Sequence, residues 1–170
     1  SNNKLVSSKI NDTSGNIIFS LDDKYIFYSK LDNNHRPKTI FRHEIGTPIK
    51  NDILIFEEKN DRFTVGIDIT SDEKYFIISS GDHTTSEVYY FLSDDKAPKP
   101  QLFQKAKEGI IYSINSWGKY FYIHTNYKAE DFKICKCLHN KTNNWKDVVP
   151  AKDEVLVGGF TMLNNWMIRS

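Results

Sequence analysis

Residues 69–92 read I-T-S-D-E-K-Y-F-I-I-S-S-G-D-H-T-T-S-E-V-Y-Y-F-L. A polar turn at residues 71–73 leads into an apolar segment, residues 75–79, which is typical of a strand covered on both faces. The pair Gly81-Asp82 then introduces a loop, and residues 87–92 form a second predicted strand. A turn, a strand, a loop and a strand in this order indicate an antiparallel sheet.

The turn-then-strand pattern recurs at three other places in the chain. It appears as L-D-D-K-Y-I-F-Y in residues 21–28, S-W-G-K-Y-F-Y-I in residues 116–123 and L-N-N-W-M-I in residues 163–168. The aligned aromatic residues, which lie 50, 45 and 46 residues apart, are Tyr25, Tyr75, Tyr120 and Trp166. A constant period in this range indicates an array of structural repeats.

The composition indicates one well-packed globular chain. Of its 170 residues, 39% are hydrophobic and 14% aromatic, which argues against disorder. The net charge of +1 gives no electrostatic basis for binding nucleic acid or a membrane surface. No apolar run approaches the ~20 residues of a membrane helix, and residues 1–7 lack the apolar core of a signal peptide. With only two cysteines, the sequence predicts a reducing, cytoplasmic location.

The repeats predict an all-β fold, a partial propeller of about three and a half four-stranded blades. The predicted segments are a lead-in or remnant of an earlier strand at residues 1–15, blades at residues 16–57, 64–104 and 109–149, and a half-blade at residues 155–170. The half-blade is expected to begin with a strand over residues 155–162. Pro37 is expected to exclude a central strand at its position.

Two alternatives remain open at this level. A β-sandwich also uses many short strands, although the equal spacing favours a propeller. Residues 131–138 fit one face of a helix as well as a strand, and the repeat favours the strand. Because three and a half blades do not close a ring, the chain is expected to be a fragment of a longer protein or to form a homodimer that completes the ring.

Four segments carry a resemblance to a known family. They are R-P-K-T-I-F-R-H (residues 36–43), E-E-K-N-D-R-F (57–63), S-S-G-D-H-T-T-S-E-V (79–88), and I-H-T-N (123–126) followed by D-F-K (131–133). In order and spacing the chain resembles the propeller domain of the prolyl oligopeptidase family of serine peptidases, nearest to the oligopeptidase B (protease II) branch. The 79–88 segment is the most specific of the four.

This resemblance implies a seven-bladed propeller that caps a catalytic α/β-hydrolase domain and restricts entry to short peptides, which the oligopeptidase B branch cleaves after Lys or Arg. The Ser-Asp-His triad of such enzymes lies in the peptidase domain. The present sequence contains no G-x-S-x-G nucleophile elbow. The chain by itself is therefore predicted to be inactive, with no catalytic residue and no cofactor.

Four residues are candidates for facing a substrate: His83, Glu87, Arg36 and Arg62. The run of residues 83–87 offers a base, hydroxyls and a carboxylate, but in a loop between strands such groups commonly cap the backbone. The arginines could steer peptide carboxylates or form ion pairs with nearby acidic residues.

Cys135, Cys137 and His139 share one face of a predicted strand because they are spaced by two. A structural zinc site needs a fourth ligand and usually a longer spacing between its cysteines. Two small apolar thiols packed between blades are the favoured interpretation, so no metal is predicted.

Two functions remain open. The chain is either the access filter of an oligopeptidase B-like peptidase or a non-catalytic module that binds proteins or peptides. A reading frame that continues past Ser170 into a G-x-S-x-G segment would distinguish the first from the second.

Overall fold

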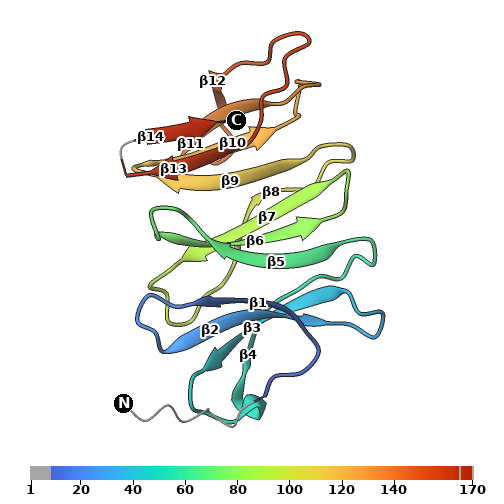
Figure 1. The fold of residues 1–170 in the computed structure, drawn as a ribbon, viewed down its shortest axis with the longest axis vertical. Coiled ribbons are helices and arrows are strands. Elements are labelled where there is room, and N and C mark those ends of the chain that lie inside the picture. Colours follow the sequence, from blue (N-terminus) through green and yellow to red (C-terminus); the bar gives the residue numbers. More distant parts are fainter. Residues whose placement is uncertain (1–8, 165, 170) are drawn as a thin grey trace. The chain divides into compact units, whose positions relative to one another are not determined.

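The computed structural model describes residues 9–164 and 166–169. Within them the chain forms 14 strands and one short 3-10 helix, η1 (Ile49–Asn51). Three sheets contain four strands each, a fourth contains two, and every sheet uses strands that are consecutive in sequence (Figure 1). This arrangement confirms the predicted all-β partial propeller.

The strands fall into four groups. The first sheet contains β1 (Thr13–Phe19), β2 (Tyr25–Leu31), β3 (Pro37–Glu44) and β4 (Ile53–Glu57). The second contains β5 (Thr64–Ile69), β6 (Tyr75–Gly81), β7 (Ser86–Leu92) and β8 (Gln101–Gln104). The third contains β9 (Tyr112–Trp117), β10 (Tyr120–Thr125), β11 (Lys133–Leu138) and β12 (Lys146–Val149). A hairpin of β13 (Phe160–Leu163) and β14 (Trp166–Arg169) follows. The backbone groups into two compact units, residues 1–67 and 68–170.

The first sheet differs from expectation at its start. Strand β1 begins at Thr13, so residues 13–15 of the expected lead-in are strand, with a register irregularity between Thr13 and Ile17. The apolar pair Leu5-Val6, which suggested an earlier strand, lies outside the described residues. The division into a lead-in and a single partial propeller stays a prediction.

Pro37 lies in a central strand, contrary to expectation, because β3 pairs with both β2 and β4. It is the first residue of β3 and lies opposite Leu31, just after a register irregularity between Lys30 and Leu31. The missing N–H of proline therefore falls at the end of the ladder, where a sheet tolerates it.

In the first and second sheets, side-chain hydrogen bonds fix the turn of the turn-then-strand pattern. The Thr70 hydroxyl donates to the Asp72 carboxylate at 2.9 Å and accepts the N–H of Tyr75 at 3.1 Å. Glu73 completes this turn with a φ of 59°. Residues 20–25 form a turn of the same design with a serine hydroxyl. A short hydroxyl and a carboxylate two residues apart thus fix the turn that starts the second strand of the first and second sheets.

The larger core of residues 68–170 lies between the second and third sheets. Phe121 of β10 is completely buried at its centre. The ring centroids around it lie at 4.9 Å (Tyr75), 5.1 Å (Tyr90), 5.4 Å (Phe103) and 4.5 Å (His139). Such aromatic contacts add to the stabilisation that apolar burial provides.

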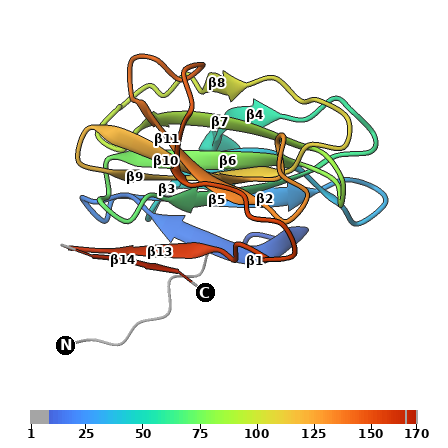
Figure 2. The ribbon, with the colours of Figure 1, turned by 90° about the horizontal axis from the view of Figure 1, so that it is seen from above.

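A second cluster joins the third sheet to the C-terminal hairpin. Its buried members are Tyr122, Ile134, Val157 and Met162. Seen from above, β11, β10 and β9 of the third sheet follow one another in order, and the hairpin of β13 and β14 lies below them in the view (Figure 2).

Residues 131–138 contain a strand rather than a helix, since β11 pairs with β10 over its full length. The strand expected over residues 155–162 is confined to β13. The backbone of Val157 explains this difference, because its N–H bonds the Asp131 carbonyl at 2.8 Å and its carbonyl bonds His124 at 2.7 Å. These two hydrogen bonds occupy the backbone of Val157, so residues 155–159 do not pair as a strand of a sheet.

Candidate functional site

The loop between β6 and β7 is fixed by its own polar side chains. One carboxylate oxygen of Asp82 accepts the N–H and the hydroxyl of Thr84, at 2.9 and 3.0 Å, and the N–H of Thr85 at 3.0 Å. Thr85 is buried, and its hydroxyl accepts the Gly109 N–H at 3.3 Å. The hydroxyls of this run thus cap backbone groups and lock the loop to the connection that follows β8.

Glu87 and His83 occupy different environments in this loop region. Glu87 is half-buried, and its two oxygens accept the hydroxyl of Tyr89 at 2.8 Å and the N–H of Ala106 at 3.0 Å. His83 is exposed near the tip of the loop. The structure does not bring them together around a nucleophile, and contact of either with a substrate stays a prediction.

A glycine is required at position 81 because the backbone of Thr85 in this loop passes close to it. A Cβ built on Gly81 would overlap the carbonyl oxygen of Thr85, which is fixed by the hydrogen bond from the Asp82 N–H. We expect Gly81→Ala to lower the free energy of unfolding by about 1–3 kcal/mol, the usual range for overpacking, as measured by urea denaturation. Gly66→Ala is the matched control, because a Cβ there meets open space. Equal stability of the two variants would contradict this account.

Arg36 and Arg62 lie near one another in sequence-distant segments of residues 1–67. The Arg36 guanidinium donates to the Asp61 carbonyl at 2.6 Å and lies 3.6 Å from the Asp32 carboxylate. Arg62 is exposed, and its backbone N–H bonds the side chain of Asn60 at 3.0 Å. Arg36 thus forms an ion pair with a neighbouring acid, and the steering of peptides by either arginine stays a prediction.

Cys135 and Cys137 are buried free thiols on β11. The Cys135 thiol donates to the Asp147 carboxylate at 3.2 Å, and His139 lies 3.0 Å from the Ser116 hydroxyl. In residues 9–164 and 166–169, no cluster of three His, Cys, Asp or Glu side chains is arranged to hold a metal ion. Burial raises the pKa of Cys135 to about 12, helped by its bond to Asp147, and raises that of Cys137 to about 11.

These raised pKa values predict slow thiol chemistry in the folded protein. Because the thiolate is the reactive form, labelling by Ellman's reagent at pH 8 should be roughly 100-fold slower than in urea-unfolded protein. The folded state keeps its protons while unfolded thiols ionise near pH 8.5, so stability should fall as the pH rises through the range from about 8.5 to 12. Rapid labelling of both thiols under native conditions would contradict the buried placement.

A buried polar cluster near β3 is not evident from the sequence. The Asp52 carboxylate contacts Nδ1 of His43 at 2.6 Å and accepts the hydroxyl of Tyr28 at 2.7 Å. The side chains of His43 and Asp52 are only 5% and 4% exposed. Next to them, the guanidinium of buried Arg42 lies 4.6 Å from the centre of the Tyr25 ring. The Asp52 cluster and the Arg42–Tyr25 contact both join residues within the first sheet and its loops, and so stabilise it.

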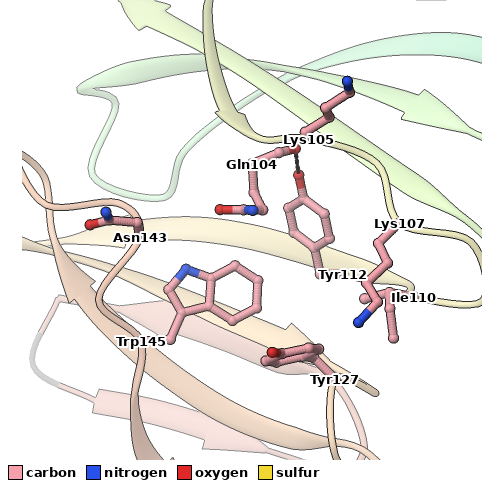
Figure 3. A pocket seen from close by; sticks show the side chains of 8 residues that line it. All are labelled: Gln104, Lys105, Lys107, Ile110, Tyr112, Tyr127, Asn143 and Trp145. Atoms are coloured by element: carbon pink, nitrogen blue, oxygen red, sulfur yellow. Dashed lines mark hydrogen bonds between the residues drawn. The ribbon is translucent and has the colours of Figure 1, made fainter.

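A pocket of about 300 Å³ opens between the second and third sheets (Figure 3). Its lining comes from the connection between β8 and β9 and from the two loops that flank β11. The lining residues are Gln104, Lys105, Lys107, Ile110, Tyr112, Tyr127, Asn143 and Trp145. Three aromatic rings surround the space and the Lys107 side chain stands beside it, so the pocket combines apolar walls with positive charge (Figure 3).

Hydrogen bonds hold two of these rings in place. The Tyr112 hydroxyl donates to the Gln104 carbonyl at 2.6 Å and accepts the Val88 N–H at 3.0 Å. The Trp145 indole N–H donates to the Thr142 carbonyl at 2.6 Å. The rings of Tyr112 and Trp145 lie 5.7 Å apart. Their polar atoms are thus occupied, and their carbon faces form fixed walls.

Comparison with known proteins places the chain in a family. Residues 1–170 match the family described as "Prolyl oligopeptidase, N-terminal beta-propeller domain". The chain belongs to this propeller family. The resemblance inferred from the four sequence segments is therefore confirmed. The three four-stranded sheets and the two-stranded hairpin correspond to part of a prolyl oligopeptidase propeller.

Individual relatives agree with this membership. The propeller segment is 32% identical over 147 residues to Protease 2 of Moraxella lacunata, covering 79% of this chain and 21% of that protein. It is 28% identical over 172 residues to dipeptidyl aminopeptidase BI of Pseudoxanthomonas mexicana, covering 97% of this chain and 23% of that protein. The segment thus spans less than a quarter of the length of either relative.

Solved structures show the same fold. Oligopeptidase B from Trypanosoma brucei, in its closed form with covalently bound antipain, matches with a TM-score of 0.92 over 97% of this chain and 24% of that one. Oligopeptidase B from Leishmania major matches with a TM-score of 0.88 over 96% and 24%. Both are 22% identical to the propeller segment.

Proposed function

We propose that this propeller segment controls access of short peptides to an oligopeptidase B-like serine peptidase that cleaves after Lys or Arg. Its partner is the catalytic α/β-hydrolase domain of that enzyme. The observation that carries the proposal is the 32% identity to Protease 2 over 147 residues, within a family match that spans the chain. The two buried free thiols support a reducing, cytoplasmic setting for this enzyme.

The proposal assigns no chemical step to this segment. Its sequence lacks the G-x-S-x-G elbow that presents a serine nucleophile in α/β-hydrolases. The catalytic serine, acid and base therefore belong to another part of the enzyme. His83, Glu87, Arg36 and Arg62 remain the residues proposed to face entering peptides, with exposed Arg62 and His83 the most accessible of them.

A fluorogenic peptide with Arg before the scissile bond tests this assignment. The isolated chain should give no hydrolysis above the buffer rate, while an oligopeptidase B assayed in parallel should be active. Hydrolysis by the chain that a serine-directed inhibitor abolishes would overturn the proposal. Sequencing the reading frame beyond the codon for Ser170 is the second test, and continuation into a G-x-S-x-G segment is the expected result.

A non-catalytic interaction module is the second candidate function. Exposed apolar side chains on the first sheet and on the C-terminal hairpin favour surfaces that another chain or domain covers. They are Ile17, Phe19, Ile53 and Leu54 on the first sheet and Leu163, Trp166 and Ile168 on the hairpin. In the peptidase, further blades would cover them. In a stand-alone module, a second copy would do so by completing a ring, and light scattering at micromolar concentration distinguishes that dimer from a monomer.

A further inference from the structure

The pocket between the second and third sheets has a charge that none of its walls neutralises. Lys105 and Lys107 are its only ionisable lining residues besides the two tyrosines, and both are exposed. The Lys107 ammonium lies 5.3 Å from the centre of the Tyr127 ring, at the side of the pocket (Figure 3). An anion entering here would meet the Lys107 ammonium and no carboxylate among the lining residues, whereas the Lys105 ammonium points away from the rings (Figure 3).

Glu87 binds the same connection between β8 and β9 that carries Lys107. Glu87 is held by the Tyr89 hydroxyl and the Ala106 N–H, and it is not among the lining residues. A carboxylate in the pocket would therefore be attracted by Lys107, although the exposure of this lysine keeps that attraction sensitive to salt.

The other walls suit an apolar group. The rings of Tyr112, Tyr127 and Trp145 surround the space, with the Tyr127 ring at 84° to the indole and 6.2 Å from it. This edge-on arrangement and the fixed hydroxyl of Tyr112 leave carbon surfaces for a side chain to contact. The amides of Gln104 and Asn143 supply donors and acceptors at the rim.

We propose that this pocket binds the C-terminal residue of a peptide whose last side chain is apolar or aromatic. Its carboxylate pairs with Lys107, and its side chain lies against Tyr112, Tyr127 and Trp145. The rim amides bond the peptide backbone. A volume of about 300 Å³ is at the small end of ligand pockets, which suits one residue rather than a long segment. The site is separate from the four residues proposed to face entering peptides, none of which lines this pocket.

Fluorescence anisotropy with fluorescein-labelled Ala-Ala-Phe tests the proposal. The peptide with a free C-terminus should bind the 170-residue chain at least 10-fold more tightly than the same peptide with a C-terminal amide. Raising NaCl from 50 to 500 mM should weaken the binding of the free-acid peptide several-fold, because Lys107 is exposed. Unlabelled acetyl-Ala-Ala-Phe and acetyl-Phe, used as competitors, separate a peptide from a free aromatic acid. Equal competition by both would overturn the peptide assignment.

Matched variants locate the binding site. Lys107→Gln should weaken the binding of the free-acid peptide at least 5-fold and leave the binding of the amide peptide unchanged. Lys136→Gln should change the affinity for neither peptide, because Lys136 lines a different pocket. Trp145→Phe should weaken both peptides, with near-UV circular dichroism as the check on folding. Equal affinity for acid and amide, or full affinity in Lys107→Gln, would overturn the proposal, as would an absence of binding at millimolar peptide.

Discussion

Replacing Asp52 by alanine is expected to lower the free energy of unfolding by about 3–5 kcal/mol, because it leaves two buried polar groups unsatisfied at a cost of about 1–3 kcal/mol each. The carboxylate is the common acceptor for His43 and Tyr28, at 2.6 and 2.7 Å. Without it, a buried imidazole and a buried phenol lose their partner at once. Urea denaturation followed by circular dichroism measures the change, which should appear in the midpoint rather than in the slope.

Two control variants test whether the loss of stability comes from the buried contacts of Asp52. Tyr28→Phe removes only one of the two bonds and should cost about 1 kcal/mol. Asp153→Ala removes an exposed carboxylate and should stay within about 0.5 kcal/mol of the parent protein. If Asp52→Ala were no more damaging than Tyr28→Phe, the Asp52–His43 contact would not contribute to stability.

Phe121→Ala is expected to be equally severe, at about 3–5 kcal/mol, because it opens a cavity in the core between the second and third sheets. The ring is 0% exposed and touches four other rings with centroid distances between 4.5 and 5.4 Å. Those rings belong to several strands and cannot all move into the vacated space. Thermal unfolding and urea denaturation should both report the loss.

An exposed aromatic residue provides the control for this variant. Trp166 is 73% exposed on β14, and Trp166→Ala should change stability by no more than about 0.5 kcal/mol. A similar effect of the two substitutions would mean that aromatic burial at Phe121 is not what holds the two sheets together.

The strands were predictable where their signals are local. Strand β7 differs from the prediction of residues 87–92 by a single residue at its start. The turns before β2 and β6 were also evident, since a hydroxyl and a carboxylate at fixed spacing make them. Strand β13 was misjudged because the backbone of Val157 bonds distant residues, Asp131 and His124, which no local pattern reveals.

The pocket could not be predicted for a related reason. Tyr127 and Trp145 come from separate loops, and only the packing of the second sheet against the third brings them beside Lys107. In the sequence, Tyr112 is marked only by its place in the predicted blade of residues 109–149. The Asp52–His43 pair depends likewise on η1, a single helical turn too short for periodicity to detect. Both clusters depend on contacts between segments, whereas the family resemblance was visible in continuous runs of sequence.

The use of consecutive strands in every sheet has a consequence for how the chain folds as it is made. Each four-stranded sheet is complete within about one repeat of sequence, so none must wait for a distant strand. Short loops close faster than long ones. At synthesis rates of about 5–20 residues per second, one sheet emerges every few seconds. The first sheet can therefore form before the strands of the third have left the ribosome, and the aromatic core around Phe121 closes only once the third sheet has formed.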